Sequence, residues 1–282
     1  MKPVLKYRGG KAQEITRFLP YFPKSYDRYI EPFLGGGAVY FFLEPENAVL
    51  NDVNRRLMTF YRQLKNNYAE MRRQLDGLQR LYEKNQQAYN IEKERNPEKR
   101  ISNGNEELYY KIRSLFNHPD DSYLDGVLYY FINKTSYSGM IRYNSNGEYN
   151  VPFGRYRNFN TRLVTYRHSD LLKGAELYCL DYREIFSIAG NDDFMFLDPP
   201  YDSIFNDYGN VQMANGFDEG EHRRLAEDFR NLPCRALMII GKTELTEELY
   251  KSYISGEYLK NYGVNIRNRF KNDNMHLIVR NF

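Results

Sequence analysis

The sequence predicts an α/β fold: an open sheet that binds a nucleotide-like ligand and is interrupted by a long helical insertion. Three observations support this prediction. Residues 30–52 follow the pattern strand, glycine turn, helix, strand; the apolar runs 194–197 and 236–240 have the length of strands; and residues 55–89 repeat apolar side chains at intervals of three and four. Open α/β sheets bind ligands beyond the carboxyl ends of their strands, where the polar residues of this chain fall.

Composition narrows the class of protein further. The 282 residues are 41% hydrophobic without an apolar run long enough to cross a bilayer, and the N-terminus lacks the apolar stretch of a signal peptide, so we expect a cytoplasmic protein. The 40 Lys and Arg nearly balance the 37 Asp and Glu, and the net charge is +3. The cysteines and histidines lack the number or spacing of disulfide or metal sites (Cys179, Cys234, His118, His168, His222, His276).

The unit at 30–52 carries a candidate nucleotide site. The glycines at 35–37 let the backbone approach a ligand closely, and Asp52 at the end of the next strand is placed to accept hydrogen bonds from ribose hydroxyls. Tyr40 stands where dinucleotide enzymes have their third spaced glycine, so a non-dinucleotide adenosine ligand fits better. Taken alone, the glycines also fit an ordinary turn and Asp52 an ordinary cap.

The Asp-Pro-Pro-Tyr motif at 198–201 is the most specific signal in the chain. Its prolines fix a rigid turn without N–H donors, which leaves the Asp198 carboxylate and the Pro199 carbonyl as paired acceptors. Two acceptors suit one exocyclic NH2 group, because holding both hydrogens frees the nitrogen lone pair for in-line attack on a sulfonium methyl. Tyr201 offers a face on which the target ring can stack. A structural proline turn is the alternative interpretation.

The insertion is predicted to combine helices with a hairpin. Residues 55–89 read as amphipathic helix, 92–107 as a charged connection, and 109–133 as further helix interrupted by a His-Pro pair. Residues 140–151 alternate about an Asn-Gly pair, which is a strong short-range hairpin signal.

Basic and aromatic side chains are interleaved across this hairpin region. Residues 134–167 contain a single acid, Glu148. Cations with aromatic faces suit a nucleic acid, which offers phosphates and stackable bases. A solvated loop with buried tyrosines is the alternative. The residues concerned are Lys134, Arg142, Arg155, Arg157, Arg162 and Arg167, with Tyr137, Tyr143, Tyr149, Tyr156 and Tyr166.

In their order along the chain, these motifs resemble those of the Dam-type, D12-class DNA adenine methyltransferases, in which a target-recognition insertion separates the cofactor motif from the catalytic motif. The similar segments are Lys-Tyr-Arg-Gly-Gly-Lys at 6–11, Glu-Pro-Phe-Leu-Gly-Gly-Gly at 31–37, Asn-Asp-Val-Asn at 51–54 and the motif at 198–201. The resemblance implies a Rossmann-like sheet, S-adenosylmethionine as methyl donor, no metal, and methylation at N6 of an adenine flipped out of double-stranded DNA.

The resemblance also implies roles for individual residues. Cofactor contacts fall to Tyr7, Lys11, Phe33, Gly35, Gly37, Asp52, Asp181, Tyr182 and Asp198, and methyl transfer to Asp198, Pro199, Pro200 and Tyr201. DNA contacts fall to Lys6, Tyr137, Ser138, Met140, Arg142, Pro152, Arg155 and Tyr156. GATC-specific relatives usually have Asn-Gly-Leu where this chain has Ser-Gly-Met at 138–140, and a Ser-Asn-Ser-like segment in place of Gly-Lys-Thr at 241–243. We therefore expect GATC as the recognition sequence from the resemblance, but the residues of the hairpin do not decide it.

We thus expect a catalytic methyltransferase domain at 1–54 and 168–282, and a helical and β-hairpin DNA target-recognition domain at 55–167. Two alternatives remain. An amino-methyltransferase acting on RNA or on a protein amide would use the same planar-amine chemistry, although the basic hairpin favours duplex DNA. A nonenzymatic DNA-binding module could retain the fold, although the intact motif at 198–201 argues against it. The sequence indicates neither a protein partner nor an oligomeric state, and it does not separate a solitary enzyme, one of a restriction-modification pair and a phage-borne enzyme.

Overall fold

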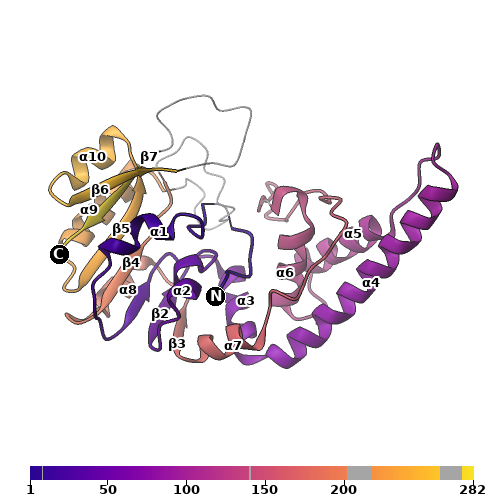
Figure 1. Ribbon diagram of the computed structural model, residues 1–282, viewed down its shortest axis with the longest axis horizontal. Helices are drawn as coiled ribbons and strands as arrows, with labels where there is room; N and C mark the ends of the chain where they lie inside the picture. The colour runs from indigo at the N-terminus through magenta and orange to yellow at the C-terminus, as the bar shows by residue number, and fades with distance from the viewer. Residues whose placement is uncertain (8, 140, 202–216, 261–274) are drawn as a thin grey trace. The chain divides into compact units, whose positions relative to one another are not determined.

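The computed structural model describes residues 1–7, 9–139, 141–201, 217–260 and 275–282. These residues form two compact units, which Figure 1 labels by their elements. Unit 1 consists of Met1–Gly9 and Asn54–Lys173, and unit 2 of Gly10–Val53 and the described residues from Gly174 onward. The two units and the two expected domains divide the chain at different residues, since 1–9 and 168–173 belong to unit 1.

Within the described residues, unit 2 contains one seven-stranded sheet in the order β3-β2-β1-β4-β5-β7-β6. Strands β1 to β5 are parallel, whereas β7 is antiparallel to both β5 and β6. The predicted α/β class is therefore confirmed. The strands are β1 (Tyr29–Glu31), β2 (Ala48–Asn51), β3 (Ala175–Tyr178), β4 (Phe194–Leu197), β5 (Arg235–Gly241), β6 (Ile254–Leu259) and β7 (Met275–Arg280).

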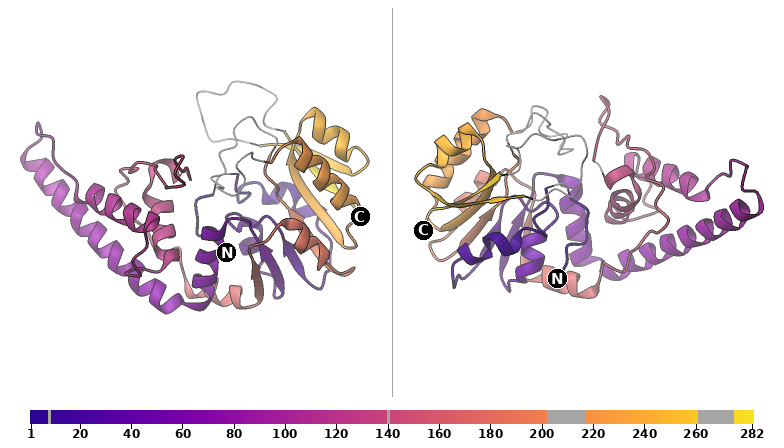
Figure 2. Two further views of the ribbon diagram at one scale, coloured as in Figure 1. Left: turned by 180° about the vertical axis from the view of Figure 1, so that it is seen from behind. Right: turned by 45° about the horizontal axis from the view of Figure 1, so that its top comes forward.

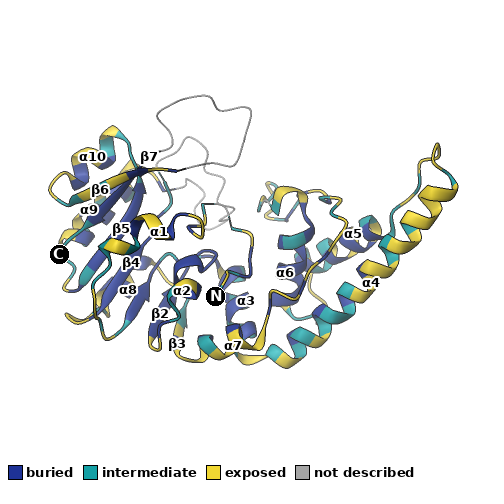
Figure 3. Cartoon of the chain, in the orientation of Figure 1, coloured by how far each residue is buried: buried dark blue, intermediate teal, exposed yellow. Residues whose placement is uncertain are grey.

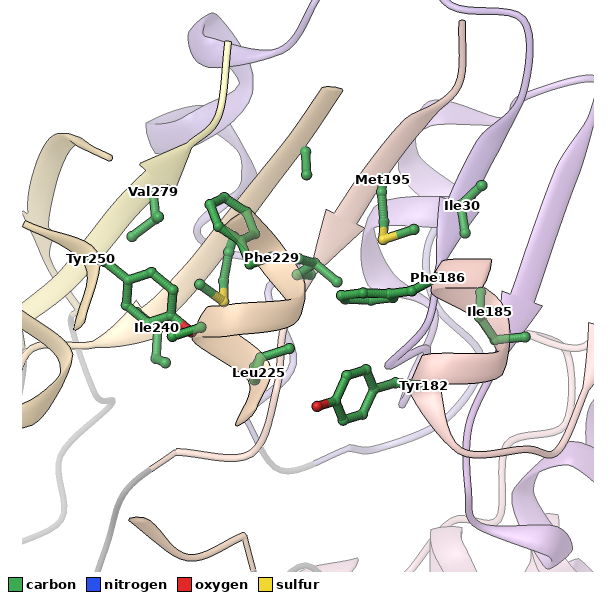
Figure 4. Close-up of a cluster of buried hydrophobic side chains, with 14 of the residues drawn as sticks. Ile30, Tyr182, Ile185, Phe186, Met195, Leu225, Phe229, Ile240, Tyr250 and Val279 are labelled. Atoms are coloured by element: carbon green, nitrogen blue, oxygen red, sulfur yellow. The ribbon is translucent and has the colours of Figure 1, made fainter. Parts of the chain in front are cut away.

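Alternating side chains give the sheet two apolar faces. Ile30, Met195 and Ile240 point to the face covered by α8, α9 and α10, where they meet Phe186 and Phe229 (Figure 4). Figure 2 shows these helices on the face opposite to α1. Full burial of large apolar side chains contributes about 1.5–3 kcal/mol each. The helices are α1 (Ile15–Phe18), the 3-10 turn η1 (Leu19–Tyr21), α2 (Ala38–Leu43), α8 (Tyr182–Ser187), α9 (Glu219–Arg230) and α10 (Glu244–Tyr250).

Aromatic rings pack the second face of the sheet. Phe18 of α1 stacks on Phe196 at a centroid distance of 5.4 Å, and Phe22 meets Phe194 edge-on at 4.8 Å. These separations lie in the favourable range for aromatic pairs. They hold the segment that follows Lys11 against β4, the strand that Asp198 directly follows.

Unit 1 is mainly helical. Its elements are α3 (Arg55–Asn66), α4 (Tyr68–Arg95), α5 (Gly104–Asn117), α6 (Asp125–Thr135), the 3-10 turn η2 (Tyr137–Gly139) and α7 (Tyr166–Lys173). The helices predicted at 55–89 and 109–133 are confirmed, with breaks at Asn67 and after Asn117. The connection predicted at 92–107 is shorter, because α4 continues to Arg95. Figure 3 shows that the second half of α4 is largely exposed.

The hairpin predicted at 140–151 is only partly correct. A loop does close, with Asn144 N–H donating to Glu148 O at 2.8 Å and Gly147 at φ 76°, but the described residues here form isolated bridges rather than strands. The reason lies in α5. The Asn117 side chain bonds both the N–H and the carbonyl of Tyr149, and the Tyr109 hydroxyl bonds Val151 O at 2.7 Å. Helix side chains thus occupy backbone groups that a second strand would otherwise pair.

In the part of the chain that the structure describes, every helix is too short or too polar to cross a lipid bilayer.

Candidate functional site

The order of the strands places the candidate site between β1 and β4. From β1 the chain proceeds to β2 and β3 on one side, whereas β4 leads to β5 on the other. The loops after β1 and β4 therefore lead away from each other at the carboxyl ends, which is the position where open α/β sheets form their ligand-binding crevice. The glycine turn at 35–37 follows β1, and Asp198 follows β4 directly.

The glycine turn is held by Asp52 at the end of β2. Gly35 N–H donates to Asp52 Oδ2 at 2.9 Å, and the Asp52 side chain is buried. Gly35 and Gly37 have φ values of 48° and 66°, in the left-handed region that side chains with a Cβ avoid. The two features predicted separately from sequence, the glycines and the strand-terminal acid, are thus brought together.

Asn51 joins the ends of three strands. Its amide nitrogen donates to Pro32 O after β1 and to Leu180 O after β3, each at 3.0 Å, and its side-chain oxygen accepts from Leu180 N–H at 2.8 Å. The side chain is buried within β2. This clamp fixes the loops on both sides of Asp52.

Phe33 and Tyr182 form an aromatic pair beside the glycine turn. Their ring centroids lie 5.4 Å apart, and the Tyr182 hydroxyl donates to Asp228 at 2.9 Å. Asp181 caps α8 by accepting from Arg183 N–H at 3.0 Å. The structure therefore brings Phe33 and Tyr182 together, whereas the Asp181 carboxylate also serves its own helix.

The Asp198 carboxylate is anchored through one oxygen. Lys11 Nζ lies 2.6 Å from Asp198 Oδ1, and the Tyr201 hydroxyl donates to the same oxygen at 3.3 Å. Lys11 is 1% exposed and Asp198 21% exposed. Both of these contacts are made to the same oxygen, Oδ1. Pro199 is buried and Pro200 half-buried.

A buried charge cluster lies behind Lys11 and Tyr201. Glu14 accepts from the Tyr258 hydroxyl at 2.8 Å and lies 3.1 Å from both Lys260 Nζ and His276 Nδ1. Burial alone would raise the pKa of Glu14, but the bond from His276 and the charges of Lys11 and Lys260 outweigh it and lower that pKa to about 2. Sequence reasoning missed this cluster because its members come from distant parts of the chain.

The Tyr201 ring rests on the same cluster. Its centroid lies 5.0 Å from that of His276, and Lys11 Nζ lies 4.9 Å above the ring. A Cβ placed on Gly241 would lie 3.8 Å from Tyr201 Cγ, an ordinary van der Waals distance, so the end of β5 packs beside the ring.

Glu31 is a second acid that sequence reasoning did not single out. It is buried at the end of β1 and accepts from the Tyr29 hydroxyl at 2.8 Å. Burial raises the pKa of Glu31 to about 8, and the nearby charges of Asp198 and Asp52 add to the rise. The Glu31 carboxyl group is therefore largely protonated at neutral pH.

In unit 1, the predicted DNA contacts Lys6 and Tyr156 lie against each other. Lys6 Nζ lies 4.0 Å from the centroid of the Tyr156 ring. The Asn133 side chain holds the Lys6 backbone by two bonds, accepting from its N–H at 2.8 Å and donating to its carbonyl at 2.7 Å. Burial and the charge of Lys6 lower the pKa of Lys134 to about 8.

The other predicted DNA contacts lie on the loop that follows α6. Tyr137 is 57% exposed, and its N–H donates to Pro152 O at 2.9 Å. Arg142 Nε donates to Asn150 Oδ1 at 2.9 Å, so its guanidinium is already oriented across the loop. Ser138 is exposed and adopts φ 54°. Met140 lies outside the described residues.

Arg155 has a strained backbone. Its φ is 54°, unusual for a residue other than glycine, and its side chain is exposed. The neighbouring Gly154 is tightly enclosed, since a Cβ there would lie 2.4 Å from Tyr156 and 2.7 Å from Ser136 O. The chain around Arg155 is thus fixed by packing.

Tyr7, a predicted cofactor contact, is half-buried in unit 1, whereas Lys11 belongs to unit 2.

Within the described ranges, no group of three or more His, Cys, Asp or Glu side chains is arranged to hold a metal ion. The polar groups that meet at the crevice are carboxylates, a lysine and backbone amides.

Comparison with known proteins gives consistent matches along the chain. Residues 7–264 match the family model described as D12 class N6 adenine-specific DNA methyltransferase. The chain is 36% identical, over the full length of both proteins, to type II methyltransferase M.CviBI of Paramecium bursaria Chlorella virus NC1A. It is 29% identical to type II methyltransferase M.MjaIII of Methanocaldococcus jannaschii, covering 92% of this chain and 90% of that protein. It is 28% identical to DNA adenine methylase of Escherichia coli K12, covering 88% and 83%.

Proposed function

We propose that this chain, which belongs to the D12 class of N6 adenine-specific DNA methyltransferases, transfers the methyl group of S-adenosylmethionine to an adenine flipped out of duplex DNA. The observation that carries this proposal is the position of Asp198. Its carboxylate lies directly after β4, the strand next to β1, whose following loop carries the glycine turn, and Lys11 fixes one of its oxygens.

The chemistry of the crevice fits an adenosine-containing sulfonium cofactor. The Asp52 carboxylate suits the ribose hydroxyls, and the Phe33 and Tyr182 rings offer apolar faces to the adenine. The left-handed backbone at Gly35 and Gly37 allows close approach of a ligand. When bound, the cofactor supplies an electrophilic methyl group.

The residues at 198–201 orient the target amine. Asp198 Oδ1 is occupied by Lys11 and Tyr201, so Oδ2 is the oxygen presented to one amine hydrogen, and the Pro199 carbonyl accepts the other. Fixing both hydrogens directs the nitrogen lone pair toward the methyl group. The proton released when the amine gains a methyl group passes to Asp198 or to solvent.

Unit 1 supplies the recognition of DNA in this proposal. Lys6, Tyr137, Arg142 and Tyr156 share the surface formed by the N-terminal arm and the loop after α6, and this surface combines cations with aromatic rings. GATC is the recognition sequence to test first, as the resemblance to Dam-type enzymes implies.

A labelling experiment tests the proposal. The purified protein is incubated with S-adenosylmethionine carrying a tritiated methyl group and with unmethylated duplex DNA, RNA or protein extract. We expect DNA to carry the label, and long-read modification sequencing to place it on adenine N6 within one short sequence. Asp198→Asn should bind the cofactor but transfer little label. Dominant labelling of RNA or protein would contradict the proposal.

A further inference from the structure

A groove with a basic lining runs along unit 1, and Arg155 is the one predicted DNA contact among its lining residues. It encloses about 920 Å³ between the second half of α4, the connection at 96–103 and the segment 153–157. Two acids, Glu94 and Glu106, are outnumbered by five cations in its lining. These cations are Lys93, Lys99, Arg100, Arg155 and Arg157.

Four of the five cations have side chains without a partner among the described residues. Within the described residues, the side chains of Lys99, Arg100, Arg155 and Arg157 make no hydrogen bond or ion pair, and all four are exposed. Lys93 is different, because its ammonium bonds the carbonyls of Pro97 and Lys99 and so shapes the connection. Unpaired cations around a concave surface favour an anionic ligand.

The second half of α4 is not explained by packing. The last buried residue of α4 is Tyr82, and none of the residues 83–95 is buried. Isolated helical turns gain little stability without a packed face. This half of α4 nevertheless forms one wall of the groove, with Gln86, Tyr89 and Asn90 on the groove side.

The groove begins at the recognition surface. The Tyr82 hydroxyl donates to the carbonyl of Tyr156, and Arg155 lines the groove with its backbone held at φ 54°. From Tyr82 to Lys93 the helix rises about 16 Å at roughly 1.5 Å per residue. B-DNA rises about 3.4 Å per base pair, so this length corresponds to about five base pairs.

We propose that this groove binds the phosphate backbone of duplex DNA flanking the recognition sequence, about five base pairs to one side. The inference rests on the proposed function and deepens it by assigning a second contact with the same substrate. Guanidinium and ammonium groups neutralise phosphates without reading bases, so the contact adds affinity and a salt dependence that are independent of sequence.

The test compares a groove variant with a matched control. Lys99→Gln/Arg100→Gln removes two unpaired groove cations, whereas Lys84→Gln/Arg95→Gln removes two exposed cations from the opposite side of α4. At about 100° per residue, Lys84 and Arg95 lie roughly 160° and 180° from Gln86 around the helix. Both double variants lower the net charge equally. Fluorescence anisotropy measures their affinity for a duplex with about 3 base pairs beside the recognition sequence and for one with about 12.

We expect the groove variant to bind the long duplex about tenfold more weakly than wild type, with the salt slope reduced by about 2, and the short duplex equally well. The control should match wild type on both duplexes. Wild-type-like binding of the long duplex by the groove variant would overturn the inference, as would an equal loss on both duplexes. Failure of the proposed function appears separately, as absence of adenine methylation by the wild-type protein on either duplex.

Discussion

Replacing Asp198 should destabilise the fold as well as abolish methyl transfer, because Lys11 is buried against Asp198. Lys11 is 1% exposed and its ammonium lies 2.6 Å from Asp198. Removing one partner of a buried ion pair costs about 3–5 kcal/mol, since the other charge is left uncompensated. Asp198 is 21% exposed, and the charge of Glu14 acts on Lys11 as well. For Asp198→Ala we therefore expect a loss of about 2–3 kcal/mol.

A double-mutant cycle measured by urea denaturation isolates this term. Lys11→Met/Asp198→Ala removes both charges, so it should be less destabilised than the sum of the single variants by about 1–2 kcal/mol. Asp198→Asn keeps an acceptor for Lys11 and should lose less stability than Asp198→Ala while remaining inactive. If Asp198→Ala unfolds at the wild-type urea concentration and the cycle shows no coupling, the Lys11 pair does not stabilise the fold and the reasoning is wrong.

Three further predictions concern the cofactor, the pH response and specificity. Asp52→Ala should weaken binding of S-adenosylmethionine by about 1.5–3 kcal/mol per lost ribose bond. Asp52→Asn keeps an acceptor for Gly35 and should weaken binding less. Calorimetric titration of both variants checks this, and unchanged binding would contradict it. Because burial raises the pKa of Glu31 to about 8, wild-type stability should decrease as pH rises from about 4.5 to about 8, and Glu31→Gln should flatten this decrease in urea titrations. Arg142→Ala should reduce discrimination at one base pair by about 1–3 kcal/mol, measured as relative kcat/KM on singly altered duplexes. Asn150→Ala removes the acceptor that orients the Arg142 guanidinium and should reduce this discrimination partly. An equal fall in kcat/KM on all duplexes would indicate that Arg142 contacts a phosphate.

Much of the fold was predictable because its signals are local. The turn at 35–37, the helix after it and the strand ending at Asn51 occupy one short stretch, and each has its own pattern of glycine or apolar spacing. The motif at 198–201 was recognisable for the same reason. The family and the enzyme class that these motifs indicated are confirmed by the match over residues 7–264.

The parts that escaped prediction depend on contacts between distant residues. Glu14, Tyr258 and His276 form one cluster, yet 244 positions separate Glu14 from Tyr258, and no spacing rule connects them. The hairpin at 140–151 had the right turn signal, but the side chain of Asn117 in α5 bonds its backbone. Sequence periodicity describes how a segment behaves alone, and here a neighbouring helix determines the outcome.

The proposed site also limits the electrostatic repulsion among its acidic side chains, and the sequence alone does not reveal how. Three acids, Glu31, Asp52 and Asp198, lie at the ends of neighbouring strands, where three negative charges would repel one another. Each acid has a different environment: Glu31 has a raised pKa of about 8, Asp52 accepts a backbone N–H, and Asp198 is paired with Lys11. Protonation of Glu31 and pairing of Asp198 with Lys11 each remove one uncompensated negative charge from this group of acids. Both effects reduce the repulsion that three ionised carboxylates at the ends of neighbouring strands would otherwise produce.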